Sequence, residues 1–276
     1  MIEYLFQMND IRLFAVLSSV FFFISIVFII VVRSAIPLRL RYKDNATIIG
    51  TVSLISIIYG ILAGITSLYL INTNTSASNI VLGEANSTGN VYRYSQWLKE
   101  PVRSTIRHNI NDYISRVINI EWPQMRTGKI VDVNGGNYIL DKIMDEIIKY
   151  SETTTAEKRA VDKLMDDIRL VYVDRQERIE MSYSELSPEI WEVILIGTFL
   201  TLFLNFLLGM NFYFHLLSSG AAALMCASMI FLLMTLDRPF QGEFAIDPGP
   251  FEAVVSYIKE TTAKAEVNHK VEDVKR

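Results

Sequence analysis

Hydrophobic residues in this sequence are concentrated in four long blocks, two near the N-terminus and two in the C-terminal third. Each block is about as long as the roughly 20 apolar helical residues that cross a hydrocarbon core of about 30 Å. Buried helices of a large soluble protein are the alternative, but four such blocks with charged residues at their borders favour membrane spans. We therefore predict transmembrane helices at residues 13–32, 48–71, 190–210 and 212–236.

Charged residues collect where the apolar blocks stop. Arg33, Arg39 and Lys43 lie between the first two blocks, and Asp237 and Arg238 directly follow the last one. Such residues mark the point where a helix leaves the membrane, because a charge inside the hydrocarbon is costly. The first block is not a signal peptide, since its apolar run is too long and no small-residue cleavage site follows it.

The polar segment between the second and third blocks, residues 72–188, has the periodicity of a helical domain. An apolar stripe with spacings of four, four, three and four begins after Pro101, a residue suited to the start of a helix. Glu121-Trp122-Pro123 is expected to close this helix, because proline disfavours helical geometry in the residue before it. The stripe consists of Val102, Ile106, Ile110, Tyr113 and Val117.

Further helices are expected along the rest of the chain. The sequence VDVNGGNY is interpreted as a plain turn, since no Gly-Lys-Ser/Thr of a phosphate loop follows it, and a short helix is expected over residues 137–150. Thr154 and Glu157 fit a capping box that opens a longer helix. Asp247 can cap a final short helix that starts near Pro250. The predicted organisation is all-α: spans one and two in residues 1–71, a soluble helical domain in 72–188, spans three and four in 189–236, and a C-terminal motif, helix and charged tail in 237–276.

Composition adds little to this pattern, because 51% hydrophobic and 20% charged residues are close to the averages of globular proteins. A net charge of −4 and the lack of a basic patch give no sign of nucleic-acid binding. The single cysteine, Cys226, excludes an intrachain disulfide. No nucleophile, base and orienting residue occur as a set, so we expect neither an enzyme nor a cofactor.

An acidic cluster in the long helix is the one candidate for a metal site. Asp162, Asp166 and Asp167 lie close together in the sequence, but they alternate with Lys163 and Arg169. Such alternation is more typical of a solvated helix face, and we expect no bound metal.

The second predicted span carries a narrow stripe of small and hydroxyl-bearing side chains. Membrane helices associate through small residues and interhelical hydrogen bonds, so in one interpretation this stripe is a packing face. In the other interpretation the stripe lines a central pore, where hydroxyl groups meet ions or water. Separately, Asn205 in the third span is expected to need a hydrogen-bond partner. The stripe, with its GxxxG pair, consists of Ser53, Ser56, Gly60, Ala63, Gly64 and Ser67.

The end of the fourth block has a specific pattern, LDRPFQG followed by DPGPF. Together with two spans on each side of a helical domain, this pattern resembles the bestrophin-like family of unknown function, whose members commonly end their fourth span in an LDRPF-G motif. The sequence EWPQM is similar to the family's EWP-M element. The matching positions are Glu121, Trp122, Pro123, Met125, Leu236, Asp237, Arg238, Pro239, Phe240, Gly242, Pro250 and Phe251.

The resemblance implies a function. Bestrophins are pentameric anion channels with the pore lined by the second span, so the chain is expected to form a homo-oligomeric ion channel in a lipid bilayer, with a pentamer favoured. It departs from bestrophins in that Tyr59 is the only aromatic residue in the middle of this span. The alternative is a non-conducting membrane scaffold, or a partner-binding protein that acts through its helical domain.

The orientation in the membrane is predicted from loop charges. The loop between the first two spans carries Arg33, Arg39, Arg41 and Lys43 against Asp44 alone. Basic residues of short loops stay in the cytoplasm, which puts both termini and the helical domain outside. The resemblance implies the reverse, because bestrophins keep their large domain in the cytoplasm. We base the expected orientation on the loop charges, for a multi-pass protein of a bacterial plasma (inner) membrane.

Overall fold

The computed structural model describes residues 10–36, 43–242 and 245–275. Within these residues the chain is helical and contains no strand, which confirms the predicted all-α class. Arg39 and Arg41, which enter the predicted orientation, lie outside the described residues.

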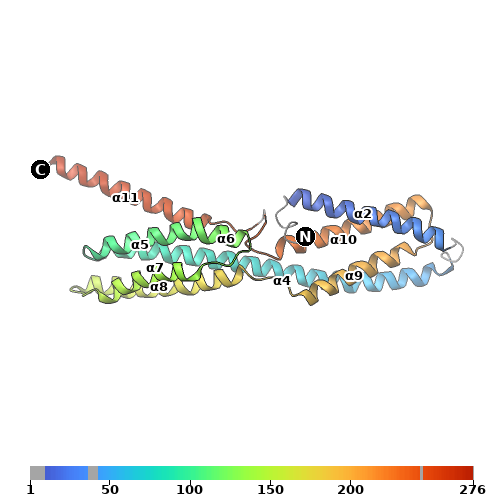
Figure 1. Cartoon of the computed structure of the whole chain (residues 1–276), viewed down its shortest axis with the longest axis horizontal. Coiled ribbons are helices and arrows are strands. Elements are labelled where there is room, and N and C mark those ends of the chain that lie inside the picture. Colours follow the sequence, from blue (N-terminus) through green and yellow to red (C-terminus); the bar gives the residue numbers. More distant parts are fainter. Residues whose placement is uncertain (1–9, 37–42, 243–244, 276) are drawn as a thin grey trace. The chain divides into compact units, whose positions relative to one another are not determined.

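The chain forms two compact units, each described here by itself (Figure 1). The first, which we call the membrane unit, contains the described parts of residues 1–74, 184–238 and 242–244. The second, which we call the helical unit, contains the described parts of residues 75–183, 239–241 and 245–276.

Four helices in the described residues are long and apolar enough to cross a bilayer, which confirms the predicted number of spans. The third ends at Phe206 rather than at residue 210, because residues 207–211 form the connection to the fourth. These helices are α2 (Asp10–Ala35), α4 (Asn45–Tyr94), α9 (Pro188–Phe206) and α10 (Phe212–Leu236).

In the membrane unit, α2 and α10 pack against each other along their lengths in antiparallel directions (Figure 1). Near one end, the rings of Phe14 and Phe231 meet edge to face with centroids 5.3 Å apart. At the other end, Arg33 donates a hydrogen bond to the carbonyl of Met210 at 3.2 Å. Between α9 and α10, the hydroxyl of Ser219 donates to the side-chain oxygen of Asn205 at 2.9 Å, which is the partner that Asn205 was expected to need.

Helix α4 does not stop where its apolar run stops. The apolar run ends at Ile71 and polar residues follow, but α4 continues without a break to Tyr94. The side chains of Thr73 and Asn74 donate to the carbonyls one turn earlier, at 3.1 and 2.9 Å, and so fold back onto the helix. With no proline or glycine between residues 72 and 82, nothing breaks the helix.

The helical unit is a set of helices around one apolar core. The stripe predicted after Pro101 is confirmed, because Ile106, Ile110, Tyr113 and Val117 are all fully buried. Its helices are α5 (Val102–Arg116), a π-helical turn η2 (Val117–Glu121), α6 (Trp122–Arg126), α7 (Val133–Lys149), α8 (Thr155–Met181) and α11 (Gly249–Lys275).

Two predicted boundaries in this unit are wrong. Pro123 does not close a helix, because the wider π-helical turn before it lets the chain run on into α6. The two glycines of VDVNGGNY are not a separate turn: α7 begins at Val133, and Asp132 caps it by accepting a hydrogen bond from the backbone of Gly135.

The predicted caps are present. Thr154 accepts a hydrogen bond from the backbone of Glu157 at 3.1 Å, and the Glu157 carboxylate accepts one from the backbone of Thr153 at 2.7 Å. That second bond, with help from Lys99, lowers the pKa of Glu157 to about 2. Asp247 accepts from the backbone of Gly249 at 2.8 Å, at the start of α11, which is longer than the short helix expected there.

Candidate functional site

One face of α4 is left uncovered by the residues that the structure describes. Along the span, large apolar side chains recur at spacings of three and four and are each about three-fifths exposed. The same spacing continues into the helical unit with exposed polar or apolar side chains and no charge. We call the part within the span the α4 face. The α4 face comprises Leu54, Ile57, Ile61, Gly64 and Leu68, and the continuation comprises Asn72, Thr75, Asn79, Leu82 and Asn86.

The small-residue stripe predicted in this span has some members buried within the chain and others exposed. Ala63 and Ser67 are buried within the chain, and the Ser67 hydroxyl donates to the Ala63 carbonyl at 2.8 Å. Ser56 is half-buried. Ser53, Gly60 and Gly64 are exposed, and a Cβ built on either glycine would meet nothing within 4 Å.

The division follows from the contact between α4 and α9. The hydroxyl groups of Tyr59 and Thr198 are hydrogen-bonded at 2.9 Å, and the Tyr59 ring lies over Gly197. A Cβ at Gly197 would come within 2.5 Å of that ring, so only glycine allows this approach. One edge of the stripe therefore packs inside the chain, and the other edge borders the α4 face.

Two arginines and two glutamates are completely buried in the helical unit. Arg178 donates to both oxygens of Glu84, at 2.6 and 3.0 Å, and to Glu121 at 2.7 Å. Arg175, one turn earlier in α8, donates to Glu121 at 2.7 Å. Buried ions are tolerated only when they are paired and hydrogen-bonded. The four charges balance, so this network connects α4, η2 and α8 without burying a net charge.

The arginines of this network hold Glu121 in its charged form at neutral pH. Burial by itself would raise the pKa of Glu121, but the guanidinium groups of Arg178 and Arg175 outweigh it and keep this pKa below its ordinary value. Burial and the neighbouring Glu84 raise the pKa of Tyr113 well above its ordinary value, so its hydroxyl stays protonated and donates to Glu84 at 2.5 Å. We interpret the network as a structural connection between α4, α5, η2 and α8.

The glycine pair of α7 makes room for this network. A Cβ at Gly136 would lie 2.3 Å from a guanidinium nitrogen of Arg175. The close approach lets Arg175 donate to the carbonyl of Val133 at 3.2 Å and to the side-chain oxygen of Asn137 at 2.7 Å. This contact requires glycine at position 136, and at Gly135 a Cβ would instead meet the guanidinium of Arg116.

The family-motif residues within the helical unit come together around Trp122. Its ring packs edge-on against Phe240 and Phe251, with centroids 5.8 and 6.1 Å away, and its indole N–H donates to the carbonyl of Ile246 at 3.2 Å. Arg178 lies over the same ring at 5.4 Å from its centroid. The EWP element and the two Pro-Phe elements thus form one aromatic contact beside the ion pairs.

The charged end of α10 belongs to the membrane unit. Asp237 is buried and accepts hydrogen bonds from the backbone of Leu186 at 2.5 Å and from the indole of Trp191 at 3.2 Å. Arg238 donates to Glu185 at 2.9 Å. The Asp-Arg pair therefore attaches the end of α10 to the segment that precedes α9.

The remaining motif residues shape the backbone. Pro250 occupies the first turn of α11, where a backbone N–H would have no helical acceptor. Pro123 is the second residue after the π-helical turn η2, near the start of α6. The carbonyl of Pro239 accepts from the backbone of Ile246 at 2.9 Å. Gly242 has a φ of 90°, a left-handed conformation that favours glycine.

The acidic cluster of α8 does not converge on one point. Asp162 and Asp166 are exposed, and Asp166 pairs with Lys163 at 3.8 Å. Asp167 is buried and accepts a hydrogen bond from Asn90 at 3.2 Å. Each carboxylate has its own surroundings, as on an ordinary helix face.

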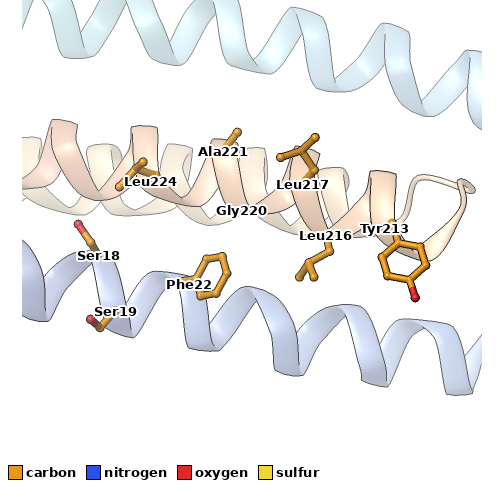
Figure 2. Close-up of a pocket in the computed structure, with 9 residues that line it drawn as sticks. All are labelled: Ser18, Ser19, Phe22, Tyr213, Leu216, Leu217, Gly220, Ala221 and Leu224. Atoms are coloured by element: carbon orange, nitrogen blue, oxygen red, sulfur yellow. The ribbon is translucent and has the colours of Figure 1, made fainter.

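A hollow of about 670 Å³ lies between α2 and α10, with side chains of both helices pointing into it (Figure 2). Its lining is apolar apart from a few hydroxyl groups, and Phe22 lies against Gly220 at its floor. No charged side chain lines it, and it lies between two helices of the same copy. The uncovered α4 face is the stronger candidate for an ion path.

These features define a class: a four-span helical membrane protein whose second span continues into a helical unit with charged pairs in its core. The chain belongs to the bestrophin-like family, since the Bestrophin-like domain matches residues 19–251. Known members of this family are channels rather than enzymes. No curated protein matches the chain.

Solved structures share the fold. A crystal structure of a mutant bacterial bestrophin homologue from Klebsiella pneumoniae has a TM-score of 0.66 at 12% identity, covering 88% of this chain and 96% of its own. Crystal structures of two mutant membrane proteins have TM-scores of 0.65 and 0.63 at 12% and 13% identity, covering 84% and 90% of this chain and 94% and 96% of their own.

Sequence reasoning missed the buried ion pairs, although a signal for them exists. The apolar stripe of α8 runs through Ile168 and Val171 at a spacing of three, and the next two positions at the same helical spacing are Arg175 and Arg178. Arginines that continue a buried stripe indicate buried partners of opposite charge. Which glutamates those partners are could not be read from the sequence.

Proposed function

We propose that this protein is an oligomeric ion channel in which the α4 face of each copy lines a common pore. The observation that supports the proposal most is the α4 face itself, an uncharged and uncovered surface that runs the length of one span. Membership of a family whose known members are ion channels supports the same conclusion.

The surroundings of the α4 face suit assembly around an axis. Ser53, Gly60 and Gly64 lie in or beside it and leave open space next to the helix. Small residues let membrane helices approach closely, so these positions can serve contacts between copies while the larger apolar side chains face the axis. A ring of apolar side chains would form a constriction that opens and closes by wetting and dewetting. The pentamer expected from the resemblance to bestrophins belongs to this proposal.

Flux through purified protein in liposomes tests the function directly. Chloride and potassium fluxes are measured separately, with protein-free liposomes as the blank and the number of copies per particle determined in nanodiscs. We expect flux of at least one ion and a single symmetric oligomer. A well-folded oligomer without flux would favour a membrane scaffold or a partner-binding protein that acts through the helical unit, and a monodisperse monomer would overturn the pore.

The proposed orientation places the loop between α2 and α4 in the cytoplasm and the helical unit outside. In a protein with Cys226 replaced by alanine, single cysteines are introduced at the exposed Ser34 and Ser151. A membrane-impermeant thiol reagent added to intact cells should label Ser151→Cys at once and Ser34→Cys only after permeabilisation. The opposite pattern would place the helical unit in the cytoplasm, as in bestrophins.

A further inference from the structure

A groove of about 460 Å³ lies in the membrane unit where α9 begins and α10 ends. Its volume falls within the usual range of ligand pockets. One part is apolar, with Leu195 and Met234 in its lining, and the other part carries the charged side chains of Glu185, Glu192 and Arg238. The groove is therefore amphipathic along its length.

Because the groove lies at the ends of two spans, we expect it at the depth where the membrane changes from headgroups to hydrocarbon. Glu185 precedes the first residue of α9 and Arg238 follows the last residue of α10, whereas Leu195 lies two turns inside α9. Trp191 lines the groove between these levels, and its indole N–H is held by Asp237 at 3.2 Å. Tryptophan is enriched at this depth in membrane proteins.

The charges of the groove select a headgroup. Arg238 has a part-exposed guanidinium that pairs with Glu185 at 2.9 Å, and a bound phosphate would accept from the same guanidinium. Glu185 and Glu192 are exposed carboxylates in the lining, and they suit a cation. With two exposed carboxylates beside one guanidinium, a headgroup of net negative charge is repelled, whereas a phosphate that carries its own ammonium group is matched on both sides.

We propose that this groove binds a zwitterionic phospholipid, with the phosphate at Arg238, the ammonium group at Glu185 and Glu192, and an acyl chain along Leu195 and Met234. The site is independent of conduction, because none of these residues belongs to the α4 face. The ligand class follows from the charge pattern and from the depth of the groove.

Trp191 provides a local readout of the occupant. Bromine atoms on an acyl chain quench tryptophan fluorescence on contact, and the other two tryptophans, Trp97 and Trp122, lie in the helical unit outside the spans. The full-length protein is reconstituted into vesicles of equal phosphatidylethanolamine and phosphatidylglycerol with the same chains. In one set only the first lipid is brominated, and in the other set only the second. Trp191→Phe identifies the signal of this residue.

We expect brominated phosphatidylethanolamine to quench Trp191 more strongly than brominated phosphatidylglycerol. Glu192→Gln should reduce this preference by up to about fivefold in relative occupancy, the size expected for one partly exposed ion pair. Glu189→Gln is the matched control, since Glu189 is exposed one turn earlier in α9 but does not line the groove, and it should keep the preference.

Three results would overturn the proposal. Equal quenching by the two brominated lipids would mean that the groove holds bulk lipid without selection. A preference that survives Glu192→Gln unchanged would mean that the carboxylates do not recognise the headgroup. Absence of quenching by either lipid in the oligomer would mean that another copy of the chain fills the groove.

Discussion

A channel formed with Ile61→Glu is expected to conduct cations in preference to anions. Ile61 is 59% exposed in the middle of the α4 face. If this face lines the pore, the substitution places one carboxylate per copy around the axis, and acidic rings select cations. The carboxylate would be hydrated there, so the assembly should survive. The measurement is the reversal potential across a planar bilayer in a potassium chloride gradient, compared with wild type.

Ile196→Glu is the matched control, because Ile196 is 57% exposed on α9 and lies outside the α4 face. A charge that faces lipid costs about 2.5–3.5 kcal/mol per copy on insertion scales. This variant should give less assembled protein. The oligomers that do form should have the same ion selectivity as wild type. The pore assignment would be wrong if Ile61→Glu assembled normally with unaltered selectivity, or if it failed to assemble while Ile196→Glu was tolerated.

The replacement of Arg178 by methionine is expected to destabilise the helical unit strongly and to lower its unfolding midpoint. Arg178 makes hydrogen bonds of 2.6–3.0 Å to Glu84 and Glu121, and the variant would leave both carboxylates buried without it. Loss of one partner of a buried pair costs about 3–5 kcal/mol, a large share of the roughly 5–15 kcal/mol that stabilises a typical protein. Near-ultraviolet circular dichroism during heating, on full-length protein in mild detergent, gives the midpoint of unfolding.

Two further variants separate this effect from a general loss of charge. Arg169→Met changes an exposed arginine on the same helix and should leave the midpoint close to that of wild type. In Arg178→Met protein, Glu121 still pairs with Arg175, so Glu84→Gln alone removes the one uncompensated charge and should recover part of the loss. Equal midpoints for Arg178→Met and Arg169→Met would show that the network does not stabilise the fold.

The sequence by itself determined the features that depend on neighbours along the chain. The four spans can be predicted because a helix in hydrocarbon makes all its backbone hydrogen bonds within itself. The length and apolar content of a segment are therefore enough to identify it as a span. The cap of α8 at Thr154 and Glu157 is readable because both partners lie within one turn. The stripe of α5 is readable because the helical period shows which residues share a side.

Only the tertiary structure decided which side of a helix meets a partner and which stays open. The period of α4 groups Ser56 with Gly60, yet the contact of Tyr59 with α9 half-buries the first and leaves the second exposed. Glu84 and Arg178 are 94 residues apart, and their pairing depends on how α4 and α8 pack. A local pattern constrains backbone conformation and amphipathic faces, whereas these pairings depend on contacts between helices distant in the sequence.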